Sequence, residues 1–421
     1  MAGRGHGPVE RALMGTDSVT AIWAICAIAL SVSGFGALIP LTTDPRPAER
    51  HGQPAQRRDR ATHRLVSVLV PAYNEEAVIE CSVRAILASE YPSLEVIVVD
   101  DGSEDGTAAI IGALAKEDAR LRILHQTGNR GKAAALNAGL AIARSELVVV
   151  IDADTAPHPA FVGRMIQPLL EGRADAVAGN VRVASRPGFI TAWQRIEYTT
   201  ILNRIRLFQG YKGSITTIAG AAGAMRRSAV LSIGGYSGDT RAEDADLTLK
   251  MMGRGYRIVY LQDAIVDTCA PVSWRALLHQ RTRWIYGNIQ CISRHLGRRS
   301  ARWSRPCGLP VFAFENLVKP PLEFIRAVIP VLVMLNFLPA ALLYGYMLVF
   351  ALHAISVSRA FSREAQRSPG LTCICTRYML WPLFAGCPYV AALCKLLTRA
   401  PVAWRKPPHQ PLRAHGIRVT R

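Results

Sequence analysis

The sequence predicts an α/β domain with a mostly parallel β-sheet, flanked by transmembrane and interfacial helices. Between Leu65 and about Ser273, short β-branched runs alternate with helical stretches, which is typical of strand–helix units in a parallel sheet. Long uncharged apolar runs lie on both sides of this region, and about 20 apolar residues suffice to span a bilayer. The formal charge is +19, and the basic residues cluster beside the apolar runs, as expected near an anionic membrane surface.

The first apolar run, Ser18 to Leu41, contains no charged residue and is long enough for one membrane span. A cleaved signal peptide is the alternative interpretation. The run is longer than a typical signal core, and an Arg-rich segment from Pro45 to Arg64 follows it, so we expect a retained anchor. Because basic segments stay on the cytoplasmic side, the domain after the anchor is predicted to be cytoplasmic.

The alternating region is the candidate catalytic or binding domain. In such sheets, ligands bind beyond the carboxyl ends of the strands, so the residues that directly follow strands are the first candidates for a site. In chain order we expect a strand in LVSVLVPAY, a helix over Glu76–Ser89, a strand in LEVIVVDDGS, a helix from Thr107, a strand in RLRILHQ, a helix near Lys132–Arg144 and a strand in ELVVVIDAD.

The apolar runs after the domain predict further membrane segments. Ala327 to Ser358 is uncharged but interrupted by Asn336 and Pro339, so it is either one long tilted helix or a two-helix hairpin. Gly308 to Glu323 contains three prolines and predicts a broken interfacial helix. The expected segments are a tail (1–17), an anchor (18–41), a basic linker (42–64), the α/β domain (65–273), interfacial helices (274–325), a transmembrane region (326–358), a basic loop (359–377), a transmembrane helix (378–397) and a basic tail (398–421).

The positive charge allows three kinds of partner: a nucleic acid, a lipid membrane or a phosphorylated substrate. Nucleic acid is the least favoured, because the sequence has neither zinc-finger spacing nor the basic–aromatic alternation of an RNA-binding sheet. The nine cysteines show no disulfide framework, which indicates a reducing cytosol for most of the chain.

Three carboxylate clusters fall where loops leave the predicted strands or where a helix begins. For Asp105 or Asp246 alone, helix N-capping explains the residue type. Two strands that both end in paired aspartates would instead direct several carboxylates at one crevice, where Mg²⁺ or Mn²⁺ would offset their charge together with substrate phosphates. The clusters are Asp100 and Asp101, Asp152 and Asp154, and Glu243, Asp244 and Asp246.

Two basic or aromatic segments add to this picture. Arg130 and Lys132 precede a good helix, whose N-terminus favours anions, so phosphate or nucleotide contact is preferred over a solvated turn. The segment LHQRTRWIYG, Leu278 to Gly287, brings together two arginines and a tryptophan. It is either a membrane-interface anchor or a site for a planar group and an anion.

The order of the motifs PAYNEE, VVDDGS, RGKAAALNAG, DAD, AGAAGAMRRSAV, AEDADL and QRTRW resembles that of family 2 glycosyltransferases of the membrane polysaccharide-synthase type. The resemblance covers Val66 to about Gly287. It is greatest to bacterial poly-β-1,6-N-acetylglucosamine synthases and is shared with hyaluronan, chitin-oligosaccharide and cellulose synthases. The segment RYMLWPLFAGCPYVAALCKLLT also looks like the C-terminal region of the poly-N-acetylglucosamine group.

This resemblance implies a GT-A fold and an inverting transfer from a UDP-sugar, such as UDP-N-acetylglucosamine, to a growing β-linked glycan. It also implies Mg²⁺ or Mn²⁺, a multi-pass location in the inner membrane, and an export or accessory membrane subunit as a further partner. Two other functions stay open. One is the transfer of a single sugar to a membrane lipid. The other is a membrane-anchored sugar-binding protein without catalysis, which would predict damage at Asp154, Asp244 or Trp284, and all three are intact.

The resemblance also implies a role for each residue that matches a motif. One departure is Ala242, where many relatives have Thr, although a hydroxyl there is not essential to a base. The expected uridine and nucleotide contacts are Ala72, Tyr73, Glu75, Asp100, Asp101 and Lys132, with Asp101 on the uracil or ribose. Asp152 would contact the sugar or ribose, Asp154 the metal, and Asp244 would be the general base beside Glu243. In QRTRW, Gln280 would bind acceptor or phosphate, Arg281 or Arg283 the diphosphate, and Trp284 would stack on the acceptor sugar.

Overall fold

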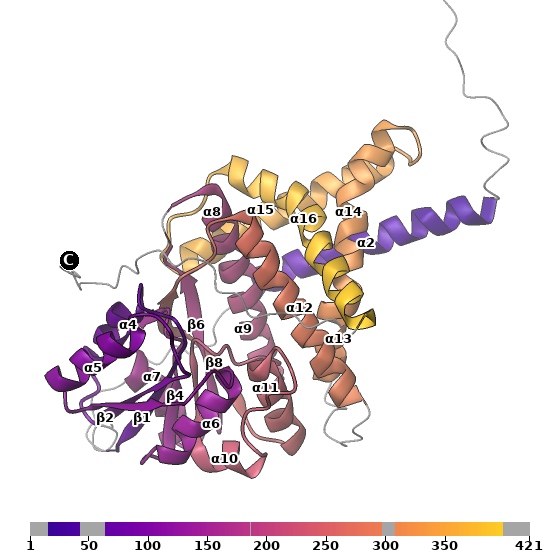
Figure 1. The fold of residues 1–421 in the computed structure, drawn as a ribbon. Helices are drawn as coiled ribbons and strands as arrows, with labels where there is room; N and C mark the ends of the chain where they lie inside the picture. Colours follow the sequence, from indigo (N-terminus) through magenta and orange to yellow (C-terminus); the bar gives the residue numbers. More distant parts are fainter. Residues whose placement is uncertain (1–15, 43–63, 186, 297–307, 399–421) are drawn as a thin grey trace, which may run out of the picture. The chain divides into compact units, whose positions relative to one another are not determined.

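A computed structural model describes residues 16–42, 64–185, 187–296 and 308–398 of the chain (Figure 1). Most of the two expected tails and of the basic linker lies outside the described residues. The chain divides into two compact units. The helical unit comprises Met1–Thr42 and Leu317–Gly386, and the sheet unit comprises Thr43–Asn316 and Cys387–Arg421.

The sheet unit contains one eight-stranded sheet with the strand order β3-β2-β1-β4-β7-β6-β8-β5. The first four strands in this order are parallel to one another, and β6 and β8 are also parallel, whereas β7 and β5 run antiparallel to their neighbours. The mostly parallel sheet predicted from the sequence is therefore confirmed. The strands are β1 (Val66–Ala72), β2 (Leu94–Asp100), β3 (Leu121–His125), β4 (Leu147–Val150), β5 (Thr155–Pro157), β6 (Ala176–Val183), β7 (Gly223–Arg226) and β8 (Ile258–Thr268).

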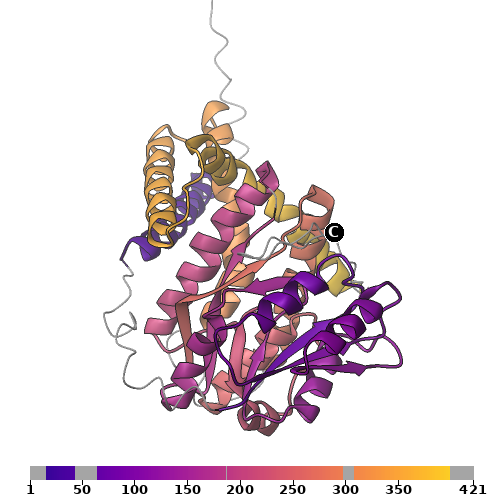
Figure 2. The ribbon, with the colours of Figure 1, turned by 90° about the vertical axis from the view of Figure 1, so that its left-hand side faces the viewer.

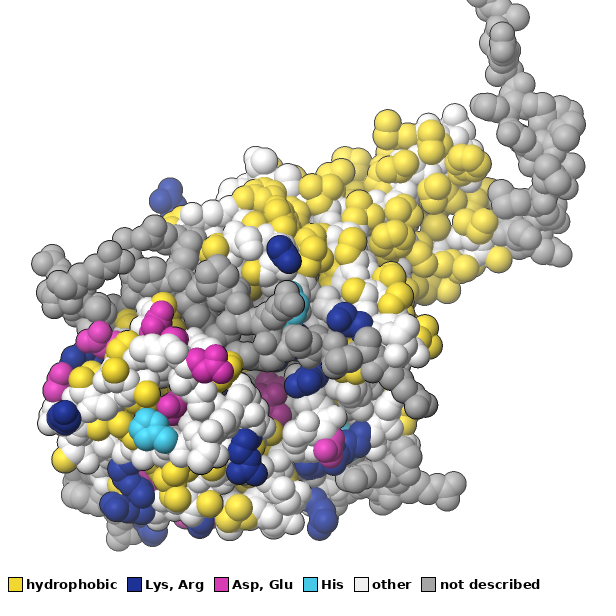
Figure 3. Space-filling view, viewed as in Figure 1, with side chains coloured by type: hydrophobic (Ala, Val, Ile, Leu, Met, Phe, Trp, Pro, Cys, Tyr) yellow, Lys and Arg dark blue, Asp and Glu magenta, His cyan; other side chains and the backbone are white. Residues whose placement is uncertain are grey.

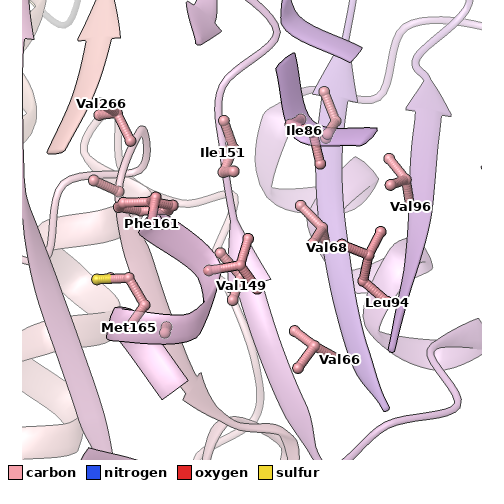
Figure 4. Close-up of a cluster of buried hydrophobic side chains, with 14 of the residues drawn as sticks. Val66, Val68, Ile86, Leu94, Val96, Val149, Ile151, Phe161, Met165 and Val266 are labelled. Atoms are coloured by element: carbon pink, nitrogen blue, oxygen red, sulfur yellow. The ribbon is translucent and has the colours of Figure 1, made fainter. Parts of the chain in front are cut away.

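Both faces of the sheet are covered by helices, as Figures 1 and 2 show. Val68 and Val70 of β1 face one buried cluster, whereas Leu69 faces a second cluster on the other side. This explains why β1 and β2 read as nearly continuous apolar runs rather than as alternating ones. The first cluster, part of which is drawn in Figure 4, packs against α4 (Ile79–Leu87), α5 (Thr107–Glu117) and α7 (Phe161–Leu170). The second packs against α6 (Lys132–Ile142), α9 (Arg204–Tyr211), α10 (Arg227–Ser232) and α11 (Glu243–Arg254).

The sequence analysis expected helices around LHQRTRWIYG but did not anticipate the helical segments between β6 and β7. The helix α8 (Phe189–Ile196) continues into a π-helical segment, η1 (Glu197–Asn203), before α9 begins. The segment LHQRTRWIYG lies inside one continuous helix, α12 (Trp274–Leu296), followed later by the short α13 (Leu309–Ala313). The face of α12 that includes Leu277, Arg281 and Cys291 is buried. The compact unit therefore extends through α12, beyond the domain boundary expected at residue 273.

The helical unit is built from α2 (Thr16–Thr42), α14 (Lys319–Met334), α15 (Ala341–Arg363) and the first part of α16 (Leu371–Leu397). A second π-helical segment, η2 (Phe314–Val318), leads into α14. Residues 335–340 separate α14 from α15, and Asn336 adopts a φ of 61° there. The interrupted run from Ala327 to Ser358 is thus two helices.

Two helices, α15 and α16, are long and apolar enough to cross a membrane. Among the described side chains of α2, the apolar stretch is shorter, Thr20–Phe35. Large hydrophobic side chains are exposed along these helices, among them Met334, Tyr344 and Leu348, and Figure 3 shows such side chains gathered on the surface. Exposed apolar surface of this extent is expected of a membrane or protein contact.

Buried polar contacts also join the helices of this unit. Arg326 of α14 forms an ion pair with Glu323 at 2.7 Å, and Glu323 accepts a hydrogen bond from Ser33 of α2 at 2.9 Å. The guanidinium of Arg326 lies 3.9 Å from the ring centre of Tyr378 in α16. A charged group that is paired in this way can be buried among apolar helices without an uncompensated desolvation cost.

Candidate active site

The loops that follow β1 and β2 are joined by hydrogen bonds into one rigid edge. The backbone N–H of Asn74 donates to Ser103 Oγ at 2.9 Å, and Asn74 Oδ1 accepts from the N–H of Glu104 at 2.8 Å. The N–H of Glu75 donates to Thr107 Oγ1 at 2.7 Å. Asn74 has a φ of 54°, a conformation that asparagine tolerates better than most residues. The sequence analysis did not single out Asn74, although its place after a strand was a usable signal.

Five residues expected to contact the nucleotide lie along this edge. Ala72 is buried at the end of β1, directly opposite Asp100 in the parallel register, and its carbonyl accepts the N–H of Asp101 at 2.8 Å. Glu75 is buried and Tyr73 is half-buried. The structure therefore brings these residues together at the carboxyl end of the sheet, where ligands of such folds bind.

Asp100 and Asp101, at the end of β2, both accept hydrogen bonds from backbone N–H groups of loops. Asp101 accepts the backbone N–H of Arg130 at 2.9 Å and that of Gly131 at 2.8 Å, so it fixes the turn that precedes α6. Asp100 accepts the N–H of Ser103 at 3.0 Å and lies 3.0 Å from His125 Nδ1. Both carboxylates are only 3% exposed. The contacts of Asp100 are those of a residue that shapes the loop.

Lys132 connects three segments that are far apart in the sequence. Its Nζ lies 2.5 Å from Asp152 Oδ1 after β4 and 3.3 Å from Glu243 Oε1 at the start of α11. Burial lowers the pKa of Lys132, but the carboxylates of Asp152, Glu243 and Asp244 together raise it above its ordinary value. The lysine is therefore a permanent cation at the centre of the carboxylate cluster.

Gly220 makes this arrangement possible, and the sequence analysis did not identify it as a site residue. A Cβ at position 220 would lie 2.6 Å from Lys132 Nζ and 3.6 Å from Asp152 Oδ1. The N–H of Gly220 donates to Asp244 Oδ2 at 3.2 Å. The small-residue run AGAAGA, which contains Gly220, was a signal that a backbone approaches something closely there.

Asp244, the predicted base, lies in the first turn of α11. Its Oδ1 accepts the N–H of Ala245 at 2.8 Å, in addition to the Gly220 contact on Oδ2. Burial and the adjacent carboxylate of Glu243 raise the pKa of Asp244, and outweigh the opposing effects of Lys132 and the two amide groups. A carboxylate whose pKa is raised toward neutrality is the kind of group that acts as a general base.

The second aspartate of the DAD motif suits a divalent cation that is shared with a substrate. Asp154 is half-buried, and its Oδ1 accepts a hydrogen bond from Thr155 Oγ1 at 3.2 Å. Asp152 is paired with Lys132 instead. Within the described ranges, no group of three or more His, Cys, Asp and Glu side chains is placed to hold a metal. Mg²⁺ bound by one or two carboxylates plus substrate phosphates needs no such group, so the oxygen donors fit it.

The QRTRW segment on α12 separates the two arginines into different environments. Arg281 is buried and forms an ion pair with Glu197 of η1 at 2.7 Å. Its guanidinium lies 4.1 Å from the ring centre of Trp284 and also donates to Gln280 Oε1. This internal pairing accounts for the charge of Arg281 in the structure. Arg283 is half-exposed and has no such partner among the residues that the structure describes.

Trp284 is partly buried and packs against the apolar cluster on one face of the sheet. A membrane-interface anchor would direct this ring away from the domain, toward lipid headgroups. The packing of Trp284 and the buried pairing of Arg281 thus argue against the anchor interpretation of LHQRTRWIYG.

The helix α12 is also attached to the loop that carries the predicted base. A Cβ at Gly287 would lie 2.7 Å from Ala242 N and from the Arg241 carbonyl carbon, so the two backbones are nearly in contact. Gln290 Oε1 accepts the N–H of Arg241 at 3.1 Å, and Cys291 Sγ lies 3.5 Å from the Ala242 carbonyl oxygen. None of these three α12 residues was recognised from the sequence, because no local pattern marks a contact between positions so far apart in the chain.

Asp246 holds α11 against α12. It is fully buried, lies 2.9 Å from His295 Nε2 and forms an ion pair with Lys250 at 2.8 Å. The sequence analysis favoured a capping role for this residue, whereas the structure assigns it to a buried network between helices. The helix that carries the QRTRW motif and the helix that carries the predicted base are therefore packed together.

A mostly parallel sheet with a carboxylate cluster beyond its strands and a DAD motif is typical of the GT-A fold. Residues 67–234 match the family model for glycosyl transferase family 2. The match is confined to these residues, which carry most of the motifs singled out in the sequence.

Among named proteins, the chain is similar to the poly-β-1,6-N-acetyl-D-glucosamine synthase of Staphylococcus aureus (strain COL), with 31% identity over 254 residues. The same synthase of Staphylococcus epidermidis is 31% identical over 253 residues. Both alignments cover 60% of this chain and 61% of the relative.

Among solved structures, the chain is similar to the mannosyltransferase PcManGT from Pyrobaculum calidifontis in complex with GDP-Man and Mn²⁺. The TM-score is 0.64 and the identity 22%, and the match covers 91% of this chain and 99% of the other. This likeness confirms the GT-A fold.

Proposed function

We propose that this protein is an inverting membrane glycosyltransferase that extends a β-linked polysaccharide from a UDP-sugar, with UDP-N-acetylglucosamine as the donor. The observation that carries the proposal is the cluster in which Lys132 bridges Asp152 and Glu243, with Asp244 beside it. This cluster joins the carboxyl end of the sheet, where the donor would bind, to the start of α11. The similarity to two synthases named for poly-N-acetylglucosamine supports the choice of sugar.

The donor would bind at the edge formed by the loops after β1 and β2. Ala72, Tyr73 and Glu75 border the uridine in this proposal, and Asp101 keeps the turn before α6 in place beside it. Lys132, as a permanent cation, attracts the donor's diphosphate and orients Asp152 toward the sugar. The N-terminus of α6, where Lys132 lies, adds a further preference for anions.

Asp244 would remove the proton from the attacking hydroxyl of the acceptor. The acceptor oxygen then forms a bond to the anomeric carbon while the bond from that carbon to the diphosphate breaks, and UDP leaves on the opposite side. A single displacement of this kind inverts the anomeric configuration and needs only one base. Mg²⁺ or Mn²⁺ held by Asp154 would neutralise charge on the diphosphate. Glu243 contributes by keeping the pKa of Asp244 raised.

The acceptor would be held by α12. Trp284 offers a flat apolar face to a sugar ring, and Gln280 offers a hydrogen-bond donor beside it. Arg283 of the same helix would contact the diphosphate of the donor. Because Gly287 of the same helix touches the Arg241–Ala242 loop, the acceptor site and the base keep a fixed separation.

The protein is proposed to be a multi-pass protein of the inner membrane. The lengths and composition of α15 and α16 and the exposed apolar side chains of the helical unit support this. The catalytic domain is proposed to be cytoplasmic because nucleotide sugars are supplied there. A polymer made on that side must cross the membrane, so export through the helices or an accessory subunit completes the proposal.

The test is to incubate membranes that contain the full chain with radiolabelled UDP-sugars and to size the products. We expect a polymer from UDP-N-acetylglucosamine, with release of UDP and with a β-linkage at the transferred residue. A product that carries only one added sugar would contradict the polysaccharide proposal. Activity only with nucleotides other than UDP would contradict the assigned donor.

A further inference from the structure

Glu197 is a buried carboxylate that the proposed mechanism does not use. It is the first residue of the π-helical segment η1, and 8% of its surface is exposed. Its Oε2 accepts a hydrogen bond from Arg281 of α12 at 2.7 Å. Taking two charges out of water costs about as much free energy as their pairing returns, so a buried ion pair contributes little net stability. The effect of this pair therefore lies in the geometry that it fixes.

The helical segment that carries Glu197 is itself fixed on two sides. At the far end of η1, Asn203 Nδ2 donates a hydrogen bond to Asn180 Oδ1 of β6 at 2.7 Å. In the preceding helix α8, Gln194 Nε2 donates to the carbonyl oxygen of Pro271 at 2.6 Å, just before α12 begins. Inserted π-helical turns are also frequent at functional sites. Glu197 is thus held against the sheet and against the start of α12.

Arg281 passes this constraint on to two side chains of the QRTRW motif. Its guanidinium lies 4.1 Å from the ring centre of Trp284 and donates a hydrogen bond to Gln280 Oε1. Both of these side chains are proposed to contact the acceptor. Because a guanidinium is planar and rigid, a carboxylate that fixes its plane also fixes the groups that stack on it or accept from it.

The ring of Trp284 is partly buried, so part of its surface remains for a sugar. A cation over an aromatic face is attracted to it and holds the ring in one orientation. A side chain that is already ordered loses less conformational freedom when a ligand binds. Fixing this ring is therefore expected to increase the affinity for the acceptor.

We infer that Glu197 is a positioning residue for the acceptor glycan. It holds Arg281, whose guanidinium keeps the Trp284 ring and the Gln280 amide in place for the growing chain. This inference rests on the proposed function and adds a residue to it. Loss of Glu197 should weaken acceptor binding and leave donor binding unchanged, because the donor edge is formed by the loops after β1 and β2.

The test measures the KM for a short β-1,6-linked oligosaccharide of N-acetylglucosamine at saturating UDP-N-acetylglucosamine, with the full chain in detergent and Mg²⁺ present. UDP affinity is measured in parallel. Glu197→Gln keeps the size of the side chain and removes its charge. We expect it to raise the acceptor KM roughly 3- to 30-fold, the range for loss of a cation–π contact, and to leave UDP affinity unchanged.

A double variant separates positioning from stability. Glu197→Leu combined with Arg281→Met removes both charges, so no unpaired charge is left buried and the fold should be retained. The acceptor KM should still be raised, because the cation over the indole is gone. This variant decides the matter if Glu197→Gln does not fold.

A second comparison shows whether Glu197 acts through the indole ring. In a Trp284→Leu background, Glu197→Gln should add little to the rise in acceptor KM, because residues that act as one unit are not additive. The matched control is Glu95→Gln, since Glu95 is also buried and pairs with Arg122 at 2.7 Å at the amino ends of β2 and β3. It should lower the melting temperature without changing the acceptor KM.

Four results would overturn the inference. They are an unchanged acceptor KM in the Glu197 variants, a loss of UDP affinity as large as the rise in acceptor KM, an equal rise in acceptor KM in the Glu95 control, and a full additional effect of Glu197→Gln in the Trp284→Leu background. By contrast, a wild-type protein that does not extend the oligosaccharide from UDP-N-acetylglucosamine would refute the proposed function itself, which distinguishes the two failures.

Discussion

Replacing Gly287 with alanine tests whether α12 positions the base. The added Cβ would lie 2.7 Å from two backbone atoms of Arg241 and Ala242 and 2.8 Å from Ala242 Cβ, closer than Cβ atoms approach in real structures. Neither side can relieve this overlap by rotating a side chain, so α12 or the loop must move by several tenths of an ångström. Overpacking of this kind costs about 1–3 kcal/mol.

The displacement should lower both stability and turnover. For a domain of this size, about 2–4 °C of melting temperature is lost per kcal/mol. Because the loop leads into Asp244, we also expect kcat to fall roughly 10- to 100-fold, the effect of a misplacement approaching 1 Å. Donor affinity should stay close to wild type, since the nucleotide edge is formed by other loops.

The assay compares melting temperature, kcat and UDP affinity of Gly287→Ala with those of Gly112→Ala. Gly112 lies in the helix α5, and a Cβ there would meet no atom within 4 Å. The control should therefore be as active as wild type and more stable by about 0.5–1 kcal/mol, from helix propensity alone. Wild-type kcat and stability in Gly287→Ala would refute the claim that this close approach holds the base in place.

Three further predictions address the site. Asp154→Asn should lower transfer more than roughly 100-fold while the protein still inserts in membranes, and full activity of wild type in excess chelator would contradict the metal assignment. Asp244→Asn should melt at a higher temperature than wild type at neutral pH, because the raised pKa of Asp244 means that its ionisation destabilises the folded state. This gain in stability should vanish at pH values below the ordinary aspartate pKa. A lower melting temperature than wild type at neutral pH would refute this reasoning. Trp284→Phe should retain much longer polymer than Trp284→Leu, since only Phe keeps a flat face for a sugar ring, and equal products at equal membrane levels would count against the acceptor role.

The parts of the fold that the sequence predicted correctly are those with strong local patterns. β1, β2 and β4 are short apolar runs followed by loop residues, and each is found close to its expected position. The ordered motifs implied the GT-A fold, which the structure confirms, and pointed to the family whose model matches residues 67–234. The structure also brings Lys132 close to Asp152 and within electrostatic reach of Asp244, at the edge of the sheet where the parallel strands end.

The parts that were missed depend on contacts between distant positions. The pairing of Arg281 with Glu197 joins residues 84 positions apart, and nothing near either residue marks the other as its partner. Similarly, Gly220 and Gly287 matter because of what lies opposite them in space, Lys132 and Ala242 respectively. The π-helical geometry of η1 is a tertiary effect as well, since side-chain periodicity alone predicts an ordinary α-helix there.

The most direct test of the account is the rate of sugar transfer by Asp244→Asn at saturating UDP-N-acetylglucosamine, measured together with its affinity for UDP. If Asp244 is the base, donor affinity should match wild type, because the nucleotide edge does not involve this residue. Transfer should fall on the order of 10²–10⁴-fold, the usual contribution of a general base. Transfer at the wild-type rate would contradict the central claim, and a loss of donor affinity that accounts for the whole defect would contradict it equally.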